Sequence, residues 1–424
     1  MKRLPLHILL ALLAFGLSAC PTPADDDDSA ADDDDDDTVG DDDDSVGDDD
    51  DDDSAGDDDD SAGDDDDAPD TSSYALMTHA PFGGDATLAT VDASDNAVSD
   101  DILGLSGSDW VIAVADGDPW LLGRSSDTVR RYSGLDFSAP TLEFSTGGGT
   151  NPHALAVCGD RIFVTRYNQN EDQTAGGDVA IFDLATGGPL GTVDLSSFNP
   201  HADGTSEPDA IVQVGDSIYV NLQLLDRDNG WAADPSAKLV KIDCATATVT
   251  GDWDVGGNPF IASVASDPTL IQVRHDTGVQ LFDTLDGSVE DVVVDTELGE
   301  GYNTIEVAFS GSSALLVAEV NWATNEIWCL DVASGALTLL DSVDQRGWSS
   351  AVAPDGNVWM LWRDHWSTPD DVEPGGVAIY DPAPCSEVTS SWLSFATDPY
   401  TITFFDFCSH LWDFSIDGNL SFFY

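Results

Sequence analysis

The fold of this chain is constrained most by a recurring unit of short apolar strands. Runs of Val, Ile, Leu, Phe and Trp, separated by Gly, Asp, Asn and Pro, follow one another from Tyr74 onward without a 3.6-residue helical period. The third strand of each clear copy ends in an aspartate. These residues are Asp183, Asp243, Asp283, Asp331 and Asp381, at separations of 60, 40, 48 and 50 residues. Four strands per period of about 40 to 50 residues predict an all-β chain folded as a β-propeller.

The repeat divides the body of the chain into seven units, although six or eight stay open as alternatives. The units begin near Tyr74, Trp110, His153, Asp209, Ile261, Thr304 and Ser349. The first unit is one strand short, and the segment from Tyr400 to Phe405 reads as its missing strand. Pairing the two ends of the chain would close the ring and remove exposed sheet edges. Residues 411 to 424 then read as an appended hairpin.

A further pattern stands at the end of the second strand, where apolar residues lead to an arginine. Its copies are Phe163-Val164-Thr165-Arg166, Leu270-Ile271-Gln272-Val273-Arg274, Trp359-Met360-Leu361-Trp362-Arg363 and, more weakly, Leu121-Leu122-Gly123-Arg124. With the polar loop and third strand that follow, it resembles the YVTN-type repeats of bacterial extracytoplasmic propellers, over roughly residues 74 to 400. Two units depart from the pattern, with Leu222 and Glu319 where Arg would stand. The resemblance implies a WD40-like propeller and says little about activity.

Four of the eleven basic residues after residue 67 share this position in the repeat. They are Arg124, Arg166, Arg274 and Arg363. On a ring they would converge near one mouth of the central channel. One interpretation is an electropositive pocket that binds an anionic ligand through the forked guanidinium geometry. The alternative is that each arginine pairs with a neighbouring aspartate and only fixes its loop.

The loops after the second strands are the longest and most aromatic in the chain. Long loops gathered on one face of a rigid scaffold usually carry recognition residues. They contain Trp231, Trp322, His365 and Trp366. Such side chains are suited to anchoring a protein or glycan partner, although tryptophans also pack between blades.

Catalytic motifs are absent from the sequence, which has no Gly-x-Ser-x-Gly, no His-Glu-x-x-His and no phosphate loop. Glu207, Asp209, Asn258 and Asn303 fall in loops between units and could together hold a divalent ion such as calcium, as in propeller lactonases. A metal-dependent hydrolase is therefore the alternative to a binding module, and no catalytic residue is assigned.

Charge excludes two classes of partner. The chain has 82 acidic and 13 basic residues, a net charge of −69. Six pure Asp runs between residues 25 and 67 contain 28 of the acidic residues, and Lys2 and Arg3 precede them. The body therefore has 82 − 28 = 54 acidic and 11 basic residues, or −43. No basic stripe exists to bind nucleic acid, and direct adsorption to an anionic lipid surface is unfavourable.

The N-terminus reads as a targeting segment. Residues 1 to 19 combine a short basic start with an apolar stretch too short to span a bilayer. Leu17-Ser18-Ala19-Cys20 resembles the lipobox of bacterial lipoproteins, which implies that Cys20 becomes the lipidated first residue of the mature protein. Residue 21 is Pro and not Asp, so the best-known signal for inner-membrane retention is missing. We expect anchorage to the outer membrane or the cell surface.

Residues 20 to 71 read as a linker between this anchor and the propeller. The Asp runs and their Ser, Ala, Gly, Thr and Val spacers offer almost no apolar surface to bury, and like charges at adjacent positions repel. We expect a disordered, extended tether. Runs of carboxylates attract calcium, but uninterrupted Asp lacks the tight turn of a high-affinity loop.

The cysteines add an expectation about closure of the ring. Export permits disulfides, and five cysteines remain besides Cys20. Cys385 and Cys408 flank the expected closing strand, so we predict that they form a disulfide. The other three are Cys158, Cys244 and Cys329, which lie in strand-like segments and are expected to be buried thiols.

The sequence thus predicts a lipid-anchored, monomeric, extracytoplasmic propeller over residues 72 to 424. Its expected role is that of a binding or scaffolding module at the bacterial cell envelope, with a lactonase-like hydrolase or a purely structural envelope component as alternatives.

Overall fold

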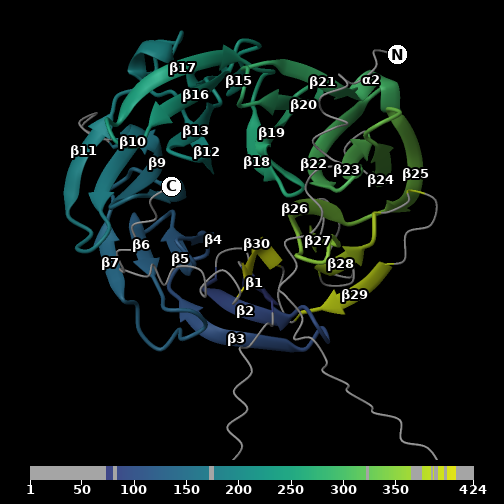
Figure 1. Cartoon of the computed structure of the whole chain (residues 1–424), viewed down its shortest axis with the longest axis horizontal. Coiled ribbons are helices and arrows are strands. Elements are labelled where there is room, and N and C mark those ends of the chain that lie inside the picture. The colour runs from purple at the N-terminus through teal and green to yellow at the C-terminus, as the bar shows by residue number, and fades with distance from the viewer. Residues whose placement is uncertain are drawn as a thin grey trace, which may run out of the picture. The chain divides into compact units, whose positions relative to one another are not determined.

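The chain folds into a seven-bladed β-propeller of four-stranded antiparallel sheets (Figure 1). This computed structural model describes residues 73–79, 84–170, 176–320, 324–363, 375–382, 385, 390–395 and 399–406. No helix in these segments is long and apolar enough to span a membrane. The predicted fold class and the count of seven blades are confirmed.

Blades 1 to 4 are built from the N-terminal part of the chain, except that blade 1 also contains the C-terminal strand. Blade 1 consists of β1 (Ser73–His79), β2 (Ala86–Asp92), β3 (Val98–Leu105) and β30 (Pro399–Asp406). Blade 2 consists of β4 (Trp110–Ala115), β5 (Asp118–Gly123), β6 (Thr128–Arg131) and β7 (Leu142–Ser145). Blade 3 consists of β8 (Pro152–Cys158), β9 (Arg161–Gln169), β10 (Gly176–Asp183) and β11 (Pro189–Val193). Blade 4 consists of β12 (Pro208–Val214), β13 (Ser217–Leu222), β16 (Lys238–Asp243) and β17 (Thr248–Asp254).

The remaining three blades complete the ring. Blade 5 consists of β18 (Phe260–Val264), β19 (Asp267–His275), β20 (Gly278–Asp283) and β21 (Val289–Val294). Blade 6 consists of β22 (Tyr302–Ser310), β23 (Ser313–Val320), β24 (Thr324–Asp331) and β25 (Ala336–Val343). Blade 7 consists of β26 (Arg346–Val352), β27 (Val358–Arg363), β28 (Gly376–Tyr380) and β29 (Ser390–Ser394). Short elements between strands are η1 (Ser196–Phe198), β14 (Leu225–Asp226), η2 (Arg227–Asn229), β15 (Ala232–Ala233) and α2 (Asp295–Leu298).

The recurring aspartate is explained by the turn between the third and fourth strands. The Asp183 carboxylate accepts hydrogen bonds from the Thr186 backbone N–H (2.9 Å) and hydroxyl (2.6 Å). Asp331 does the same with Ser334, at 2.7 and 2.6 Å. Gly187 follows in the first of these turns with a φ of 66°, a left-handed conformation that glycine adopts without steric cost. The Asp that recurs in the sequence therefore marks a turn that recurs from blade to blade.

The ring is closed by the C-terminal strand, as predicted. β30 pairs antiparallel with β1, from Ser73 opposite Asp406 to His79 opposite Pro399. It becomes the innermost strand of blade 1, whose order is β3-β2-β1-β30. The expected hairpin over residues 411 to 424 lies outside the described residues.

The hydrophobic core is divided into seven clusters, one at each junction between neighbouring blades. In β23, Leu316 packs toward blade 5, while the adjacent Leu315 packs toward blade 7. Successive side chains of a strand point to opposite faces, so a sheet buried on both faces needs apolar residues at successive positions. This is why the central strands read as continuous apolar runs.

Within the described residues, two disulfides connect neighbouring blades, and the one at Cys385 overturns its expected pairing with Cys408. Cys158 of β8 bonds to Cys244, which follows β16, so blades 3 and 4 are linked. Cys329 of β24 bonds to Cys385, which follows β28, so blades 6 and 7 are linked. Cys158, Cys244 and Cys329 are therefore not thiols. Stacking brings together strand ends that lie 86 and 56 residues apart in the chain, which spacing alone does not reveal.

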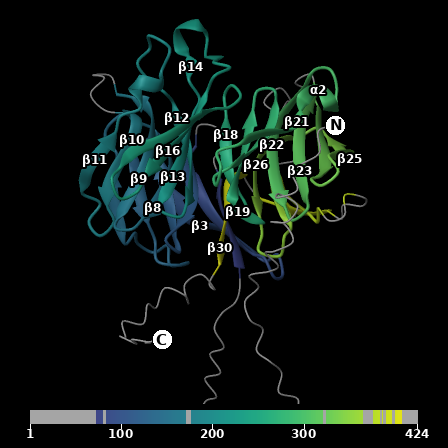
Figure 2. The same ribbon diagram turned by 45° about the horizontal axis from the view of Figure 1, so that its top comes forward.

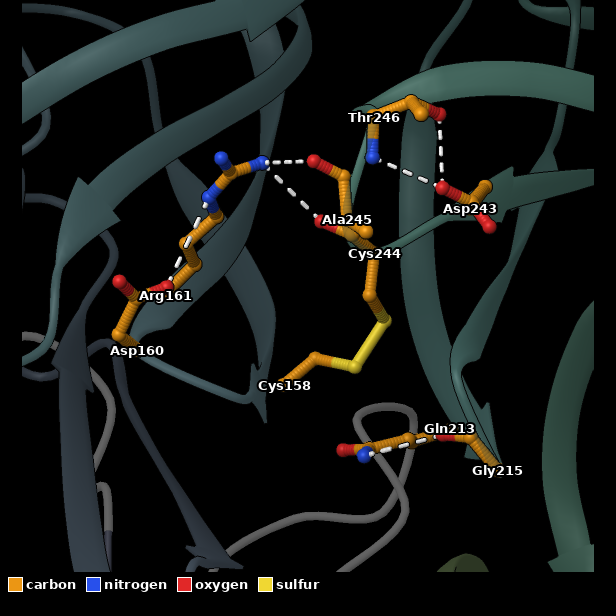
Figure 3. Close-up of a disulfide and its surroundings, with 9 residues drawn as sticks. All are labelled: Cys158, Asp160, Arg161, Gln213, Gly215, Asp243, Cys244, Ala245 and Thr246. Atoms are coloured by element: carbon orange, nitrogen blue, oxygen red, sulfur yellow. Dashed lines mark hydrogen bonds and ion pairs between the residues drawn. A yellow bond between two sulfur atoms is a disulfide. The ribbon is translucent and has the colours of Figure 1, made fainter.

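The junction between blades 3 and 4 has a second tie beside its disulfide (Figure 3). The Arg161 guanidinium of blade 3 donates to the carbonyl oxygens of Cys244 (3.1 Å) and Ala245 (2.9 Å) in blade 4. These carbonyls belong to the turn that Asp243 stabilises by accepting from Thr246. The repeat turn of blade 4 thereby becomes a docking point for the preceding blade.

Candidate functional site

A cavity of about 620 Å³ lies at the centre of the ring. Its walls come from the inner strands β4, β18, β22, β26 and β30, which surround the ring centre in Figure 1, together with residues of β19 and Arg124 after β5. Blades 5, 6, 7, 1 and 2 therefore contribute to it. Its volume is within the range of small-molecule binding sites.

In the part of the chain that the structure describes, four charged residues line the cavity: Arg124, Arg274, Glu306 and Arg346. Three of the four are cationic, although the body of the protein carries a charge of −43. The aromatic lining residues are Phe260, Trp348 and Tyr400. The cavity is thus a local concentration of guanidinium groups and aromatic rings inside a strongly acidic molecule.

Arg274 is the most exceptional of these cations. It lies opposite Phe260 in the β18–β19 ladder, and its guanidinium stacks 3.8 Å from the centre of the Phe260 ring. Among the described residues, no carboxylate oxygen lies within 4.0 Å of this guanidinium and no hydrogen-bond acceptor meets it. Burial lowers the pKa of Arg274, while the more distant charge of Glu306 opposes that shift. A guanidinium has five N–H donors, so this one is available to an anion in the cavity.

Arg346 and Arg363 face each other across β26 and β27 and share an aromatic partner. Their guanidinium carbons lie 5.6 and 4.9 Å from the Trp348 ring centre, and Arg363 lies 5.4 Å from the Tyr400 ring. Trp348 and Tyr400 themselves are 5.8 Å apart. This stack of cations and rings stiffens the wall of the cavity on the blade 7 and blade 1 side.

Among the described residues, Glu306 is the one carboxylate that lines the cavity. It lies on β22 between the blades of Arg274 and Arg346, and the Ser350 hydroxyl donates to its Oε1 at 2.6 Å. Burial raises the pKa of Glu306 to about 7, against the opposing charge of Arg274. The carboxyl group therefore exchanges its proton near neutral pH.

Arg124 begins a polar chain that leads from the cavity toward blades 3 and 4. Its guanidinium donates to the Tyr400 hydroxyl (2.9 Å) and to Nε2 of His153 (2.5 Å), and it lies 3.5 Å from the Asp109 carboxylate. Because Arg only donates, His153 Nε2 accepts and the ring proton lies on Nδ1. That Nδ1–H donates to Asp209 at 2.6 Å.

The far end of this chain is anchored on Tyr167 and Gln223. The His153 ring stacks on Tyr167 at 4.2 Å, and the Tyr167 hydroxyl donates to Gln223, whose amide donates to Asp209. Burial lowers the pKa of His153, which keeps it neutral. Burial alone would raise the pKa of Asp209, but the hydrogen bond from His153 and nearby positive charge leave it below its ordinary value. This chain of hydrogen bonds therefore holds the Arg124 guanidinium in position.

Of the four arginines predicted to converge, Arg124 and Arg274 line the cavity, whereas Arg363 is not among its described lining residues and packs on the rings of Trp348 and Tyr400. Arg166 does not line the cavity either. It is buried in blade 3, where Nε and Nη2 donate to the two carboxylate oxygens of Asp178 at 2.7 and 2.6 Å. Nη1 donates to the Thr146 carbonyl at 2.9 Å. This geometry agrees with the alternative interpretation, in which the arginine fixes its own loop.

The four residues suggested for a divalent ion are already divided between two environments. Asn258 and Asn303 line the central cavity. Glu207 accepts from Arg227 (2.7 Å) and the Leu225 backbone N–H (3.0 Å), and burial raises the pKa of Glu207 to about 7. Asp209 accepts a hydrogen bond from His153.

Within the described segments, no group of three or more His, Cys, Asp or Glu side chains is placed to hold a metal. A calcium ion at these residues stays a prediction and would have to displace these partners.

The aromatic loop residues are described only in part. Trp231 is 52% exposed on the loop of β14 and β15, which stands out beyond the neighbouring sheets in Figure 2, and Arg227 packs 4.7 Å from its ring. Trp322, His365, Trp366, Cys20 and Cys408 lie outside the described residues.

Sequence reasoning missed Glu306, Arg346, Trp348 and Phe260. That reasoning considered only the residues at the ends of the second strands. The first strand of each blade runs antiparallel to the second, so the beginning of the first strand lies beside the end of the second. Phe260 opposite Arg274 and Arg346 opposite Arg363 show this pairing. The first residues of each repeat unit were therefore the signal for the rest of the site.

Comparison with known proteins finds similarity in structure alone. No family model and no curated protein sequence matches the chain, so the resemblance to YVTN-type repeats stays a prediction. A periplasmic gluconolactonase of Pseudomonas aeruginosa matches with a TM-score of 0.56 and 13% identity, covering 79% of this chain and 99% of the other. A putative 6-phosphogluconolactonase from Bacteroides fragilis matches with a TM-score of 0.54 and 13% identity, covering 80% and 99%. At such identity, these likenesses establish that the chain shares the seven-bladed propeller fold.

Proposed function

We propose that this protein is a binding module that holds a small organic anion in its central cavity. The observation that carries the proposal is Arg274, a guanidinium that lines the cavity without a carboxylate partner among the described residues. In a body with 54 acidic and 11 basic residues, a neighbouring carboxylate would be the default partner of an arginine. A guanidinium stacked on Phe260 is instead oriented in advance, which lowers the entropic cost of binding a carboxylate or phosphate.

The remaining lining supports the same ligand class. Arg346 adds a second cation, and Trp348 and Phe260 are partly exposed apolar surfaces in the cavity wall. Such a combination favours an anion with an apolar or aromatic portion.

The purified chain tests this proposal directly. We expect benzoate, 3-phenylpropionate or phenyl phosphate to raise the Tm in a concentration-dependent way, because a ligand of the native state stabilises it. Arg274→Gln should weaken binding at least about tenfold in calorimetry, since a charge-assisted hydrogen bond is lost. Arg130→Gln is the matched control, because Arg130 pairs with Glu143 on blade 2 away from the cavity. No shift with any anion, or equal loss in both variants, would contradict the proposal.

We also propose that the protein acts at the bacterial cell envelope, anchored through a lipid on Cys20. Two disulfides between blades are typical of an exported protein, which agrees with the lipobox in the sequence. Incorporation of labelled palmitate in the bacterial host should be abolished by Cys20→Ser, which should also release the protein from membranes. Labelling that persists in the variant would exclude this anchor. Fractionation of the two membranes then tests the outer-membrane location.

A second candidate function is hydrolysis of a lactone or ester, and Glu306 is the observation that favours it. A carboxyl group with a pKa of about 7 suits general base catalysis near neutral pH, and adjacent guanidiniums could stabilise a developing oxyanion. Acid release from a panel of lactones, measured at constant pH, would identify this activity, and Glu306→Gln should abolish it. Turnover that survives this substitution would exclude Glu306 as the base.

The face that carries Trp231 is proposed to contact a protein or glycan partner, with the propeller itself a monomer. Crosslinking in intact cells, compared between wild type and Trp231→Ala, tests the contact, and sedimentation tests the oligomeric state.

A further inference from the structure

We infer that the ligand of the central cavity is an organic acid that carries a hydrogen-bond donor, a hydroxyl or an ammonium, close to its acidic group, and that Glu306 selects for this donor. The inference rests on the proposed function and names its ligand class more narrowly.

The first step concerns two opposite charges that share the cavity without pairing. Arg274 on β19 and Glu306 on β22 both line it, yet within the described part of the chain neither has an ion-pair partner within 4.0 Å. The only described side-chain donor to Glu306 is the Ser350 hydroxyl. A ligand that offers an anionic group to Arg274 and a donor to Glu306 would satisfy both groups at once.

The second step concerns what Glu306 does to a ligand without a donor. A bare carboxylate placed beside Arg274 would bring a second negative charge near Glu306. The charged groups that line the cavity around Glu306 are Arg274 on β19, Arg346 on β26 and, farther away, Arg124 after β5. Asp209 and Asp295 act on Arg274 through space and add to the negative side. An ionised Glu306 therefore disfavours a donor-free anion, whereas a donor converts the repulsion into a hydrogen bond.

The third step concerns protonation. The pKa of Glu306 lies near 7, so the group is mostly neutral at pH 6 and mostly ionised at pH 8. A protonated carboxyl group donates as well as accepts, and it does not repel an anion. Discrimination in favour of a donor should therefore be stronger at pH 8 than at pH 6.

Three probes with one carbon skeleton isolate this effect. 3-Phenylpropionate, phenyllactate and phenylalanine differ only in hydrogen, hydroxyl or ammonium next to the carboxylate, and the phenyl ring suits the Phe260 and Trp348 surfaces. We expect phenyllactate, phenylalanine or both to bind the purified chain at least about tenfold tighter than 3-phenylpropionate at pH 8. The ratio of the affinity for the donor-bearing probe to the affinity for 3-phenylpropionate should be smaller at pH 6 than at pH 8. Which of the two donors binds better distinguishes a hydroxy acid from an amino acid.

Glu306→Gln keeps the shape of the side chain and removes its charge. In this variant, 3-phenylpropionate should bind more tightly at pH 8 than in wild type, and the dependence of the ratio on pH should disappear. Glu143→Gln, on the outer strand β7, is the matched control. It should leave unchanged both the affinity for 3-phenylpropionate at pH 8 and the dependence of the affinity ratio on pH. If Glu306→Gln does not fold, the two wild-type ratios at pH 6 and 8 decide the question alone.

Failure of the role inferred for Glu306 and failure of the proposed anion site would give different results. Equal affinity for all three probes at both pH values, with Arg274→Gln still abolishing binding, would overturn the role of Glu306 and leave the anion site in place. No binding of these probes or of the earlier anions would overturn the anion site itself, and the inference with it.

Discussion

At the scale of single residues, Arg166 and Arg274 show that one position in a repeat can serve two purposes. Each stands near the end of the second strand of its blade. Arg166 donates to both oxygens of Asp178, whereas Arg274 lies on Phe260 at the edge of the cavity. The side chain opposite decides the role, and the repeat pattern in the sequence does not encode that partner.

These two arginines predict opposite consequences of the same substitution. Arg166→Gln should lower the free energy of unfolding by about 3 kcal/mol, because it leaves the partly buried Asp178 carboxylate without its cation, and should leave anion binding intact. Arg274→Gln should remove anion binding with little loss of stability. Urea denaturation and calorimetry on both variants measure this. A variant that loses both properties would show that the site and the scaffold are not separable there.

Glu306 should make the free energy of unfolding depend on pH. Its pKa is raised from 4.5 to about 7 in the folded protein, so its contribution to stability is complete below about pH 4.5 and is lost as pH rises through 7. Glu306→Gln should therefore stabilise the protein by about 1–3 kcal/mol at pH 8 and much less at pH 5. Urea denaturation at the two pH values measures the difference. Destabilisation at pH 8 would mean that the charge on Glu306 supports the fold.

At the scale of strands and blades, the sequence was informative wherever turns and apolar runs repeat. The Asp residues located the third strand in five of the seven units, and the missing strand of the first unit pointed to Tyr400–Phe405. What the sequence did not reveal is the contact between blades, because stacking joins positions with no shared pattern. Cys385 therefore pairs with Cys329 of the preceding blade and not with Cys408, and the cavity residues of the inner strands were missed.

The closing strand predicts a large effect from one side chain. Phe405 on β30 is fully buried in the cluster between blades 1 and 2. Phe405→Ala should cost about 3–5 kcal/mol, because it removes apolar contact and leaves a cavity at the junction that holds the two ends of the chain together. Leu285→Ala, at a side chain that is 78% exposed, is the control and should change stability by less than about 0.5 kcal/mol. Equal Tm values for the two variants would contradict a stabilising role for the closure.

The disulfide between blades 3 and 4 predicts a further contribution. Replacing both Cys158 and Cys244 by Ser should lower stability by about 2–4 kcal/mol, because the bond closes a long loop in the unfolded chain between residues 86 positions apart. Arg161 would still donate to the carbonyls of the partner blade, so the junction should persist. Thermal unfolding of the double variant and of reduced wild type measures the loss. An unchanged Tm in both would show that the bond does not stabilise the native ring.

At the scale of the whole molecule, charge acts against compactness. A body with a charge of −43 repels itself, and salt screens that repulsion over a Debye length of about 10 Å at 0.1 M. Raising the NaCl concentration from about 20 to about 200 mM should therefore raise the Tm by a few degrees, and KCl should do the same. The same addition should weaken anion binding in the cavity, since screening also acts on Arg274 and its ligand. A Tm that falls with salt would mean that ion pairs dominate the stability of the ring.

The pairing of β1 determines how the propeller bears mechanical load. The chain enters the ring at Ser73, the first residue of β1, which is hydrogen-bonded along its length to β2 on one side and to β30 on the other. A pull applied through the preceding residues is directed along β1 and shears two ladders together, instead of peeling one open bond by bond. A propeller held from its N-terminus thus resists tension at the strand that also closes its ring.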